Sequence, residues 1–273
     1  MTLTSDKPPV VMIFAGADPT GGAGIAADIQ AVSAMGCHPA PIVTAVTAQD
    51  TAGLKEYQVV DTELLIAQAR AVLEDMPVAA FKTGMLGNAA NLAAVQTIIN
   101  DYPSIPLVVD PVLTTGAGVE LSEQPLEDGY RTLLLPHTTL VTPNSIEMRR
   151  LAANADSPEA CAQELMSLGC EFVLCTGSHE PTDEVVHHLF GHHRMLETVS
   201  QQRLPHDFHG SGCTLAAACA AGLAQGFEVA AAVREALAFT WNSLAKGHQL
   251  GMGQYLPDRQ YWATRDPNNK SRS

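Results

Sequence analysis

Short apolar segments alternate with segments of helical spacing along the first half of this chain. The first apolar segment, residues 10–15, ends at a glycine, and residues 23–36 then have the spacing of a helix. Further strands are expected at 41–46, 79–84, 106–111 and 139–144, and the helices between them at 62–75, 88–100 and 123–134. This alternation predicts an α/β protein whose central, mostly parallel sheet is flanked by helices.

The second half of the chain continues the pattern and adds a hairpin. Residues 184–190 and 194–200 flank a Gly-His-His turn and predict two antiparallel strands. Helices are expected at 145–153, 158–168, 211–226 and 229–247, and a buried strand at 171–177. Because no linker or repeat interrupts the chain, we predict a single domain over residues 1–273, with its core at about 9–253 and a frayed, polar C-terminal tail.

Composition narrows the classes of partner. The chain has 29 acidic and 15 basic residues and a formal net charge of -14, which disfavours nucleic acids and anionic membranes as partners. Since no apolar run is long enough for a membrane span and the first residues do not resemble a signal peptide, we expect a cytoplasmic protein. The six cysteines form no CxxC pair, and only Cys213 has a setting that suggests chemistry.

Ligands of open parallel sheets bind beyond the carboxyl ends of the strands, so the turns at these ends are the candidate site. The first turn, residues 16–24 (GADPTGGAG), allows a ligand to approach the backbone and leads into a helix N-terminus. No Lys-Ser/Thr pair follows its glycines, so it is not a Walker A loop, and an ordinary flexible turn is an equal alternative. Asp18 would repel a phosphate there, which favours a hydrogen bond to a neutral, polar substrate.

Asp110 stands at the end of the apolar segment VVDPV, residues 108–112. A carboxylate in that position must be solvated, paired or bound to a metal, because the burial of an isolated charge is costly. A helix cap or a buried ion pair is an equal alternative for this residue taken alone.

The turn TPNSIE, residues 142–147, offers a second pair of oxygen-bearing side chains. Asn144 and Glu147 have the spacing of a capping box, which is the commoner role of such a pair. The alternative is that both face the strand ends and hold Mg²⁺ through water, as a triphosphate site requires.

The segment HGSGC, residues 209–213, places two glycines and a cysteine at the start of a predicted helix. The backbone N–H groups of Gly210–Gly212 could form a nest for a transferring phosphoryl group. Because the positive end of a helix dipole lowers the pKa of a thiol, we expect Cys213 to favour the thiolate and to take a proton from a substrate hydroxyl. The alternative is that Cys213 fills a tight corner.

Four histidines of the predicted hairpin, His187, His188, His192 and His193, could suggest a metal cluster. Their HH-x₃-HH spacing is not a recognised ligand pattern, and no cysteine or acid completes it. We therefore expect no metal centre at this hairpin.

Taken together and in order, these segments resemble the ribokinase superfamily, and within it the hydroxymethylpyrimidine/phosphomethylpyrimidine kinases of thiamine biosynthesis. The resemblance spans nearly the whole chain and rests on residues 15–29, 44–51, 82–86, 108–112, 142–147 and 209–214. It implies a three-layer α/β sandwich and a cytosolic homodimer. It also implies transfer of phosphoryl groups from ATP, with Mg²⁺, to the hydroxymethyl group of the pyrimidine and then to its monophosphate.

The same resemblance implies roles for individual residues. The residues expected to line the pyrimidine pocket are Gly16, Asp18, Gln49, Met85 and Val112. The residues expected to face the phosphates are Asp110, Asn144 and Glu147, with Asp110 and Glu147 holding Mg²⁺ partly through water. The anion hole is expected at Gly210, Ser211 and Gly212, and the catalytic base at Cys213. An amide such as Gln49 suits an aminopyrimidine edge because it both donates and accepts hydrogen bonds.

One position departs from the pattern of these kinases. They typically have VLVKGGH where this chain has VLCTGSH, residues 173–179, so Thr176 replaces a lysine that would contact the nucleotide phosphates. The substitution removes a point charge from the expected ATP site. Two alternatives to an active pyrimidine kinase therefore remain, a pyridoxal or pyridoxine kinase and a catalytically weak homologue that binds pyrimidine.

Overall fold

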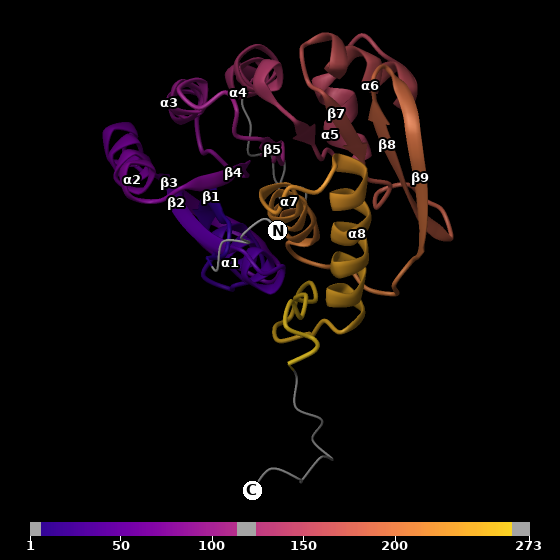
Figure 1. Ribbon diagram of the computed structural model, residues 1–273. Helices are drawn as coiled ribbons and strands as arrows, with labels where there is room; N and C mark the ends of the chain where they lie inside the picture. The colour runs from indigo at the N-terminus through magenta and orange to yellow at the C-terminus, as the bar shows by residue number, and fades with distance from the viewer. Residues whose placement is uncertain (1–6, 114–123, 264–273) are drawn as a thin grey trace, which may run out of the picture.

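A single sheet of nine strands crosses the part of the chain that the structure, a computed structural model, describes: residues 7–113 and 124–263. The strand order is β3-β2-β1-β4-β5-β6-β7-β8-β9 (Figure 1). The strands are β1 (Val10–Ala17), β2 (His38–Asp50), β3 (Gly53–Val59), β4 (Val78–Thr83), β5 (Leu107–Val109), β6 (Leu140–Val141), β7 (Phe172–Cys175), β8 (Glu184–Gly191) and β9 (Arg194–Gln202). From β2 to β7 neighbours run parallel, and β3, β8 and β9 are antiparallel to their neighbours.

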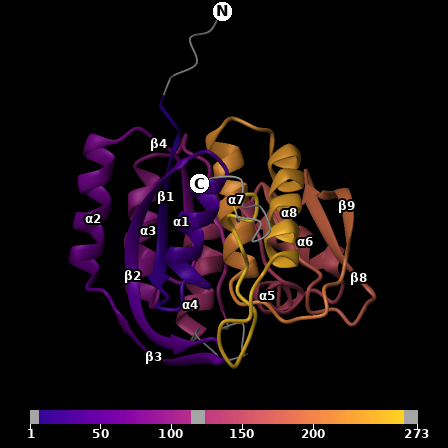
Figure 2. The same ribbon diagram turned by 90° about the horizontal axis from the view of Figure 1, so that it is seen from below.

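Helices cover both faces of the sheet and complete three layers (Figures 1 and 2). One face carries α2 (Thr62–Asp75), α3 (Ala89–Asn100), α4 (Gln124–Gly129), α5 (Ser145–Leu151) and α6 (Pro158–Ser167). The other face carries α1 (Gly24–Ala34), α7 (Ser211–Ala224) and α8 (Val229–Ala245). The predicted α/β class with a mostly parallel sheet is therefore confirmed.

The alternation of side chains along the central strands explains why both faces are covered. Met12 and Phe14 of β1 belong to the apolar core beneath α2–α6, whereas Val11 and Ile13 belong to the core beneath α1, α7 and α8. All four side chains are fully buried. A parallel strand that is apolar on both faces must be sandwiched between two helical layers.

Most predicted elements are confirmed, with two differences. The pattern of 41–46 continues into a longer strand, His38–Asp50, which turns at Thr51 into the unpredicted antiparallel strand β3. The helix expected at 123–134 is α-helical only over Gln124–Gly129 and then π-helical over Tyr130–Leu134; residue 123 lies outside the described residues.

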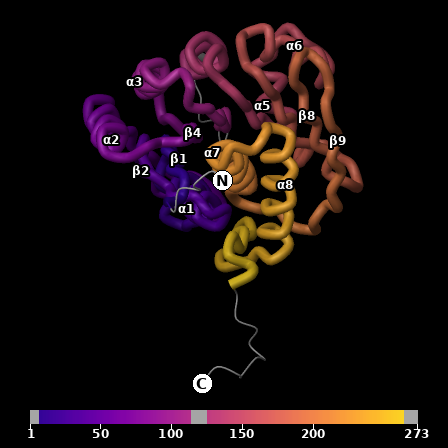
Figure 3. The backbone as a smooth tube through the Cα atoms, viewed as in Figure 1, coloured from indigo at the N-terminus to yellow at the C-terminus, as the bar shows by residue number. Residues whose placement is uncertain are grey.

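The prediction that the polar C-terminal tail frays is wrong for its described part. The segment after α8 runs along α8 and α1 (yellow in Figure 3), and Arg259 within it is only 2% exposed. Its backbone is tied to the body of the protein, since Gln254 donates to the carbonyl of Thr51 at 2.8 Å and Asp258 to that of Ser243 at 2.9 Å. These contacts with residues elsewhere in the chain stabilise a stretch that its polar composition predicted to fray.

The four histidines of the hairpin β8–β9 lie in different environments. His187 is buried, His188 is partly exposed and hydrogen-bonds to Thr198 at 3.2 Å, and His192 and His193 form the turn with φ of 51° and 56°. Burial lowers the pKa of His187 to about 4. Across the described residues, no three or more His, Cys, Asp or Glu side chains form a group that could hold a metal, and no described helix has the length and apolar character needed to cross a membrane.

His187 should make the fold sensitive to acid. Its pKa is lower in the folded chain than the ordinary value of 6.5, so unfolding takes up a proton and the stability that neutral His187 permits is lost as the pH falls from 6.5 through about 4. When the pH is lowered from 6.5 to 5, the wild type should therefore lose about 2 kcal/mol more of its free energy of unfolding than His187→Phe does. Urea unfolding at several pH values measures this. Val186→Phe, on the same strand, removes no titratable group and is the matched control; it should keep the wild-type slope, and equal slopes in all three proteins would contradict the prediction.

Candidate active site

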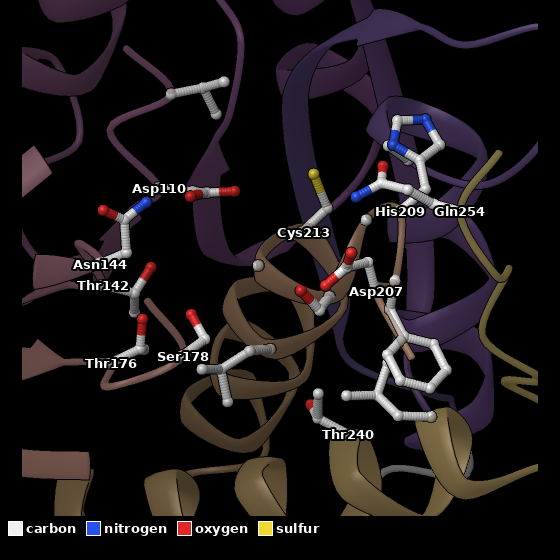
Figure 4. Close-up of a pocket in the computed structure, with 18 of the residues that line it drawn as sticks. Asp110, Thr142, Asn144, Thr176, Ser178, Asp207, His209, Cys213, Thr240 and Gln254 are labelled. Carbon is white, nitrogen blue, oxygen red and sulfur yellow. The ribbon is translucent and has the colours of Figure 1, made fainter. Parts of the chain in front are cut away.

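A pocket of about 640 Å³ opens at the carboxyl ends of the parallel strands. Every residue that the sequence singled out for binding or chemistry lines it: Gly16, Asp18, Gln49, Met85, Asp110, Val112, Asn144, Glu147, Thr176, Gly210, Ser211, Gly212 and Cys213. Figure 4 shows Asp110, Asn144 and Thr176 on one side and His209 and Gln254 on the other, with Cys213 between them at the start of α7. The fold thus brings together turns that are far apart in the chain; His209 and Asp18, for example, are separated by 191 positions.

The glycine loop after β1 owes its shape to Asp18, whose oxygens are all engaged within the protein. One accepts from the backbone N–H of Thr20 at 2.8 Å, and the other from the backbone N–H of Ala23 at 2.8 Å and from His209 Nε2 at 2.9 Å. Burial would raise the pKa of Asp18, but these hydrogen bonds lower it below its ordinary value. Asp18 therefore organises the loop, a role that the sequence analysis did not assign to it.

The N-terminus of α7 faces the pocket without a side-chain cap. Its N-cap residue, Gly210, has φ of 78°, a conformation that favours glycine. A Cβ atom there would lie 2.0 Å from the carbonyl oxygen of Gly22, so no other residue fits against the glycine loop. The exposed end of this 14-residue helix presents backbone N–H groups and the positive end of the helix dipole to any anion in the pocket.

Cys213 lies where the sequence placed it, but its expected thiolate character is wrong. Burial raises the pKa of Cys213 to about 12, and the opposing charge of Lys82 does not compensate. The helix dipole is a local effect, whereas desolvation comes from the surrounding fold and outweighs it here. Without ligands, the thiol is protonated at neutral pH.

Asp110 is a buried carboxylate with an unused oxygen. Its side chain is nearly inaccessible, and Oδ2 has no hydrogen-bond partner among the described residues. Lys82 Nζ lies 3.9 Å from Oδ2. Burial raises the pKa of Asp110, against the effects of Lys82 and of a hydrogen bond from Cys213. An unsatisfied buried oxygen in a pocket indicates a place for a cation or a donor that the ligand brings.

Asn144 and Glu147 form the capping box, so the commoner of the two expected roles is present. Asn144 Oδ1 accepts from the backbone N–H of Glu147 at 2.9 Å, and Glu147 Oε2 accepts from the backbone N–H of Asn144 at 3.0 Å. Burial and the charge of Asp110 raise the pKa of Glu147 to about 8. The cap fixes both side chains at the pocket edge, and the carboxyl of Glu147 also accepts from the backbone N–H of Leu113, so a ligand or a metal-bound water would share oxygens that the protein already engages.

The chemistry of these residues would suit a divalent cation only if a bound ligand supplied further oxygen atoms. The fit rests on the unpaired Oδ2 of Asp110 and on the nearby buried carboxyl of Glu147, since oxygen ligands suit Mg²⁺ and this ion keeps several waters or phosphate oxygens in its shell. The described residues contain no dedicated cluster that could hold a metal by itself. One or two carboxylates with a polyphosphate are the arrangement usual for a kinase.

A lysine that the sequence analysis left unassigned lies at the base of this pocket. Lys82 is fully buried on β4, and its ammonium donates to both oxygens of Asp28 on α1, at 3.0 and 2.9 Å. Burial opposes the charge, but Asp28, Cys213 and Asp110 outweigh it and raise the pKa of Lys82. The pair is therefore ionised at neutral pH. A single charged residue in the apolar segment AAFKTG was the signal that could have identified Lys82.

The two ends of the pocket differ in character. At one end Gly16 of β1, Gln49 of β2 and Met85 after β4 come from neighbouring strands, and a Cβ atom on Gly16 would lie 3.3 Å from Met85 Sδ, so glycine leaves room for this thioether. At the other end lies Thr176, which follows β7 and whose backbone N–H donates to the carbonyl of Pro143 at 2.9 Å. Thr240 and Trp241 of α8 also line the pocket. A flat heterocycle suits the first end, and an extended second ligand can enter from the other.

Comparisons with known proteins agree with this geometry. The family model for phosphomethylpyrimidine kinase matches residues 18–258. The hydroxymethylpyrimidine/phosphomethylpyrimidine kinase of Mycobacterium tuberculosis is 38% identical over 252 residues, which cover 90% of this chain and 92% of that protein. A crystal structure of phosphomethylpyrimidine kinase from Clostridium difficile 630 has a TM-score of 0.75 and 29% identity, over 86% of this chain and 98% of that one. Bacillus subtilis pyridoxal kinase, solved with ADP, has a TM-score of 0.85 at 24% identity, over 94% and 99% of the two chains, and so shares the fold.

Breaking the buried ion pair should be costly for stability. Lys82→Met leaves the Asp28 carboxylate buried without its partner, and the free energy of unfolding should fall by about 3–5 kcal/mol. The double variant with Asp28→Asn removes both charges and should lose clearly less than the sum of the two single variants. Urea unfolding of the wild type, the two single variants and the double variant measures these changes in stability. Lys55→Met, in the exposed pair with Asp50, is the control and should change stability by less than about 1 kcal/mol. A loss in Lys82→Met no larger than in this control would refute the assignment.

Proposed function

This chain belongs to the phosphomethylpyrimidine kinase family, and we propose that it transfers phosphoryl groups from ATP to 4-amino-5-hydroxymethyl-2-methylpyrimidine and then to its monophosphate, in thiamine biosynthesis. The observation that carries the proposal is the convergence of the glycine loop, Asp110, Glu147 and the uncapped N-terminus of α7 in one pocket. Phosphoryl transfer requires positioning and charge stabilisation more than covalent chemistry, and these elements supply both.

The acceptor pyrimidine is assigned to the end of the pocket where Gly16, Gln49, Met85 and Val112 lie together with the backbone around Asp18. The amide of Gln49 can both donate to and accept from an aminopyrimidine edge, which discriminates among heterocycles by hydrogen-bond pattern. Met85 provides a polarizable contact for the ring. Bound this way, the hydroxymethyl group points toward Cys213 and the start of α7.

The phosphates are assigned to the region between Asp110, Asn144, Thr176 and the N-terminus of α7. The backbone N–H groups at Gly210, Ser211 and Gly212 would stabilise the charge that spreads over the phosphoryl oxygens during transfer. When bound, Mg²⁺ supplies charge neutralisation for the phosphates, and Asp110 and Glu147 would hold it, partly through water. Thr176 offers a hydroxyl in place of an ammonium, so binding of the phosphates relies more on the helix terminus here.

Cys213 is assigned the role of proton acceptor for the substrate hydroxyl. Without ligands the thiol is protonated, because burial raises its pKa to about 12. It can accept a proton only after it has become a thiolate, which requires a higher pH or favourable charges in the occupied site. Lys82 provides one favourable charge already. In a loose transition state the substrate hydroxyl can lose its proton late in the transfer, because the reaction needs little help from a strong nucleophile.

The remaining parts of the proposal concern organisation. We assign residues 1–273 to one domain, and a homodimer in the cytoplasm follows from the resemblance to the pyrimidine kinases. The sheet that crosses the described residues without interruption supports the single domain. Light scattering of the purified chain tests the dimer.

Turnover with a panel of acceptors tests the proposed function. Purified protein with ATP and Mg²⁺ should consume ATP when given hydroxymethylpyrimidine or its monophosphate, and mass spectrometry should find the monophosphate and the diphosphate as products. Pyridoxal should be a poorer acceptor, because the Gln49 and Met85 end is assigned to an aminopyrimidine. Faster turnover with pyridoxal would reassign the substrate. Saturable pyrimidine binding without any turnover would instead indicate a binding protein that lost activity with the change to Thr176.

The base assignment predicts how rate depends on pH. Because the pKa of Cys213 is raised, the wild-type kcat should increase as the pH rises through the alkaline range. Cys213→Ala should lower kcat by about 10²- to 10⁴-fold and flatten this dependence. Cys219→Ala, which changes a buried cysteine on the same helix, is the control and should keep the wild-type profile. An unchanged rate in Cys213→Ala would show that the thiol only packs.

A further inference from the structure

A buried arginine from the C-terminal segment lies behind the pocket and has no role in the function proposed above. Arg259 is 2% exposed and is held between α1 and α7. It is not among the residues that line the pocket, so a ligand does not touch it. Its neighbours nevertheless belong to the glycine loop and to the N-terminus of α7, two turns that meet at the site.

The guanidinium of Arg259 joins these two turns by hydrogen bonds to oxygen atoms. On the α7 side it donates to Thr214 Oγ1 at 2.8 Å and to the carbonyl of Gly210 at 3.5 Å. On the glycine-loop side it donates to the carbonyls of Gly22 at 2.5 Å and Gly21 at 3.5 Å. A fifth contact reaches Gln30 Oε1 on α1 at 3.2 Å. A planar group with several fixed donors can span such a set of acceptors, and a lysine cannot.

The acceptors of Arg259 are all uncharged, which is unusual for a buried cation. Among the described residues, no carboxylate forms an ion pair with Arg259. Burial lowers its pKa to about 10, so the group still carries its charge at neutral pH. Asp28 is already paired with Lys82, and Asp18 with His209. Asp28 and Asp18 attract Arg259 without contacting it. Burial of a charge without a directly paired counter-charge is costly, and an anion that enters the pocket would offset this cost.

We propose that Arg259 is a positioning residue for phosphoryl transfer, which clamps the glycine loop to the N-terminus of α7 and keeps a positive charge, without a directly paired carboxylate, behind the N–H groups of Gly210–Gly212. The inference rests on the proposed function because it assigns those N–H groups to the phosphoryl group in transfer. The charge lies on the protein side of the helix terminus and the phosphoryl group on the pocket side. In a site with low dielectric, such a fixed charge acts across the intervening peptide groups.

The charge and the clamp make separable predictions. If Arg259 only clamped the two turns, its hydrogen-bond donors would suffice and its charge would not matter. Its replacement would then lower stability but leave the catalytic rate of folded molecules unchanged. A charge that supports the anion hole should matter most when negative charge spreads over the phosphoryl oxygens in transfer. Its loss should therefore lower kcat far more than it raises KM for ATP or for the pyrimidine.

Three variants of Arg259 separate these roles. Arg259→Gln keeps donors without charge and should lower kcat by about 100-fold, with both KM values within about threefold of wild type. Arg259→Lys keeps the charge without the fork and should be less impaired than Arg259→Gln. Arg259→Ala should regain at least about tenfold in rate with millimolar guanidinium chloride, as the free ion restores the missing group. Arg131→Gln is the control, since Arg131 braces Leu151 and Glu164 away from the pocket; it should lose stability but keep its kcat.

A binding measurement keeps this inference separate from the identity of the acceptor. ADP with aluminium fluoride mimics the phosphoryl group in transfer and needs no pyrimidine. Calorimetry should show this mixture binding at least about 30-fold more weakly to Arg259→Gln than to wild type, while ADP alone changes by less than about threefold. If the wild type were inactive on every acceptor, the proposed function would be wrong, but the calorimetric comparison of wild type with Arg259→Gln would still test the role of Arg259. Equal binding of the mimic, or equal kcat per folded molecule in Arg259→Gln and Arg131→Gln, would overturn the role of Arg259.

Discussion

The ammonium group of Lys82, enclosed at the base of the pocket, can stay there only because Asp28 lies beside it. The pair joins the central strand β4 to α1, and it lies where the two layers of the molecule meet the phosphate end of the site. Asp110, 3.9 Å from the same ammonium, and Cys213 both depend on that charge for their own electrostatic setting. Because a buried charge requires its partner, the positions of β4 and α1 relative to one another are strongly constrained.

Two kinds of structure supply the ligand-binding groups of the pocket. The ends of the parallel strands supply side chains, such as Asp110 and the capped pair Asn144 and Glu147, whose directions are set by the sheet. The glycine loop and the start of α7 instead supply backbone N–H groups, and these two turns touch each other so closely that Gly210 has no room for a side chain. Side chains suit a cation and a heterocycle, and backbone donors suit an anion. A kinase needs all three, and the fold places them at one edge of the sheet.

The sequence predicted the elements and the pocket-lining residues more completely than it predicted their electrostatics. Helical and strand periods are local, and glycines and acids that follow strands identify the edge where ligands bind, so Asp110 and Gly210 could be found. The pKa of Cys213 could not, because the helix dipole is visible in the sequence and the desolvation that outweighs it arises from the fold. Lys82 and Arg259 were missed for a related reason. The partner of Lys82, Asp28, is 54 residues away, and Arg259 reaches Gly22 across 237 residues from a segment whose composition indicates disorder.

A crystal structure of the protein with a non-hydrolysable ATP analogue, Mg²⁺ and hydroxymethylpyrimidine tests the central claim most directly, which is that this pocket aligns a phosphoryl donor and a pyrimidine across the start of α7. The account predicts the γ-phosphate against the N–H groups of Gly210–Gly212, the pyrimidine ring beside Gln49 and Met85, and the hydroxymethyl oxygen between Cys213 and the phosphorus. A pyrimidine bound outside the pocket, or a triphosphate directed away from α7, would contradict it.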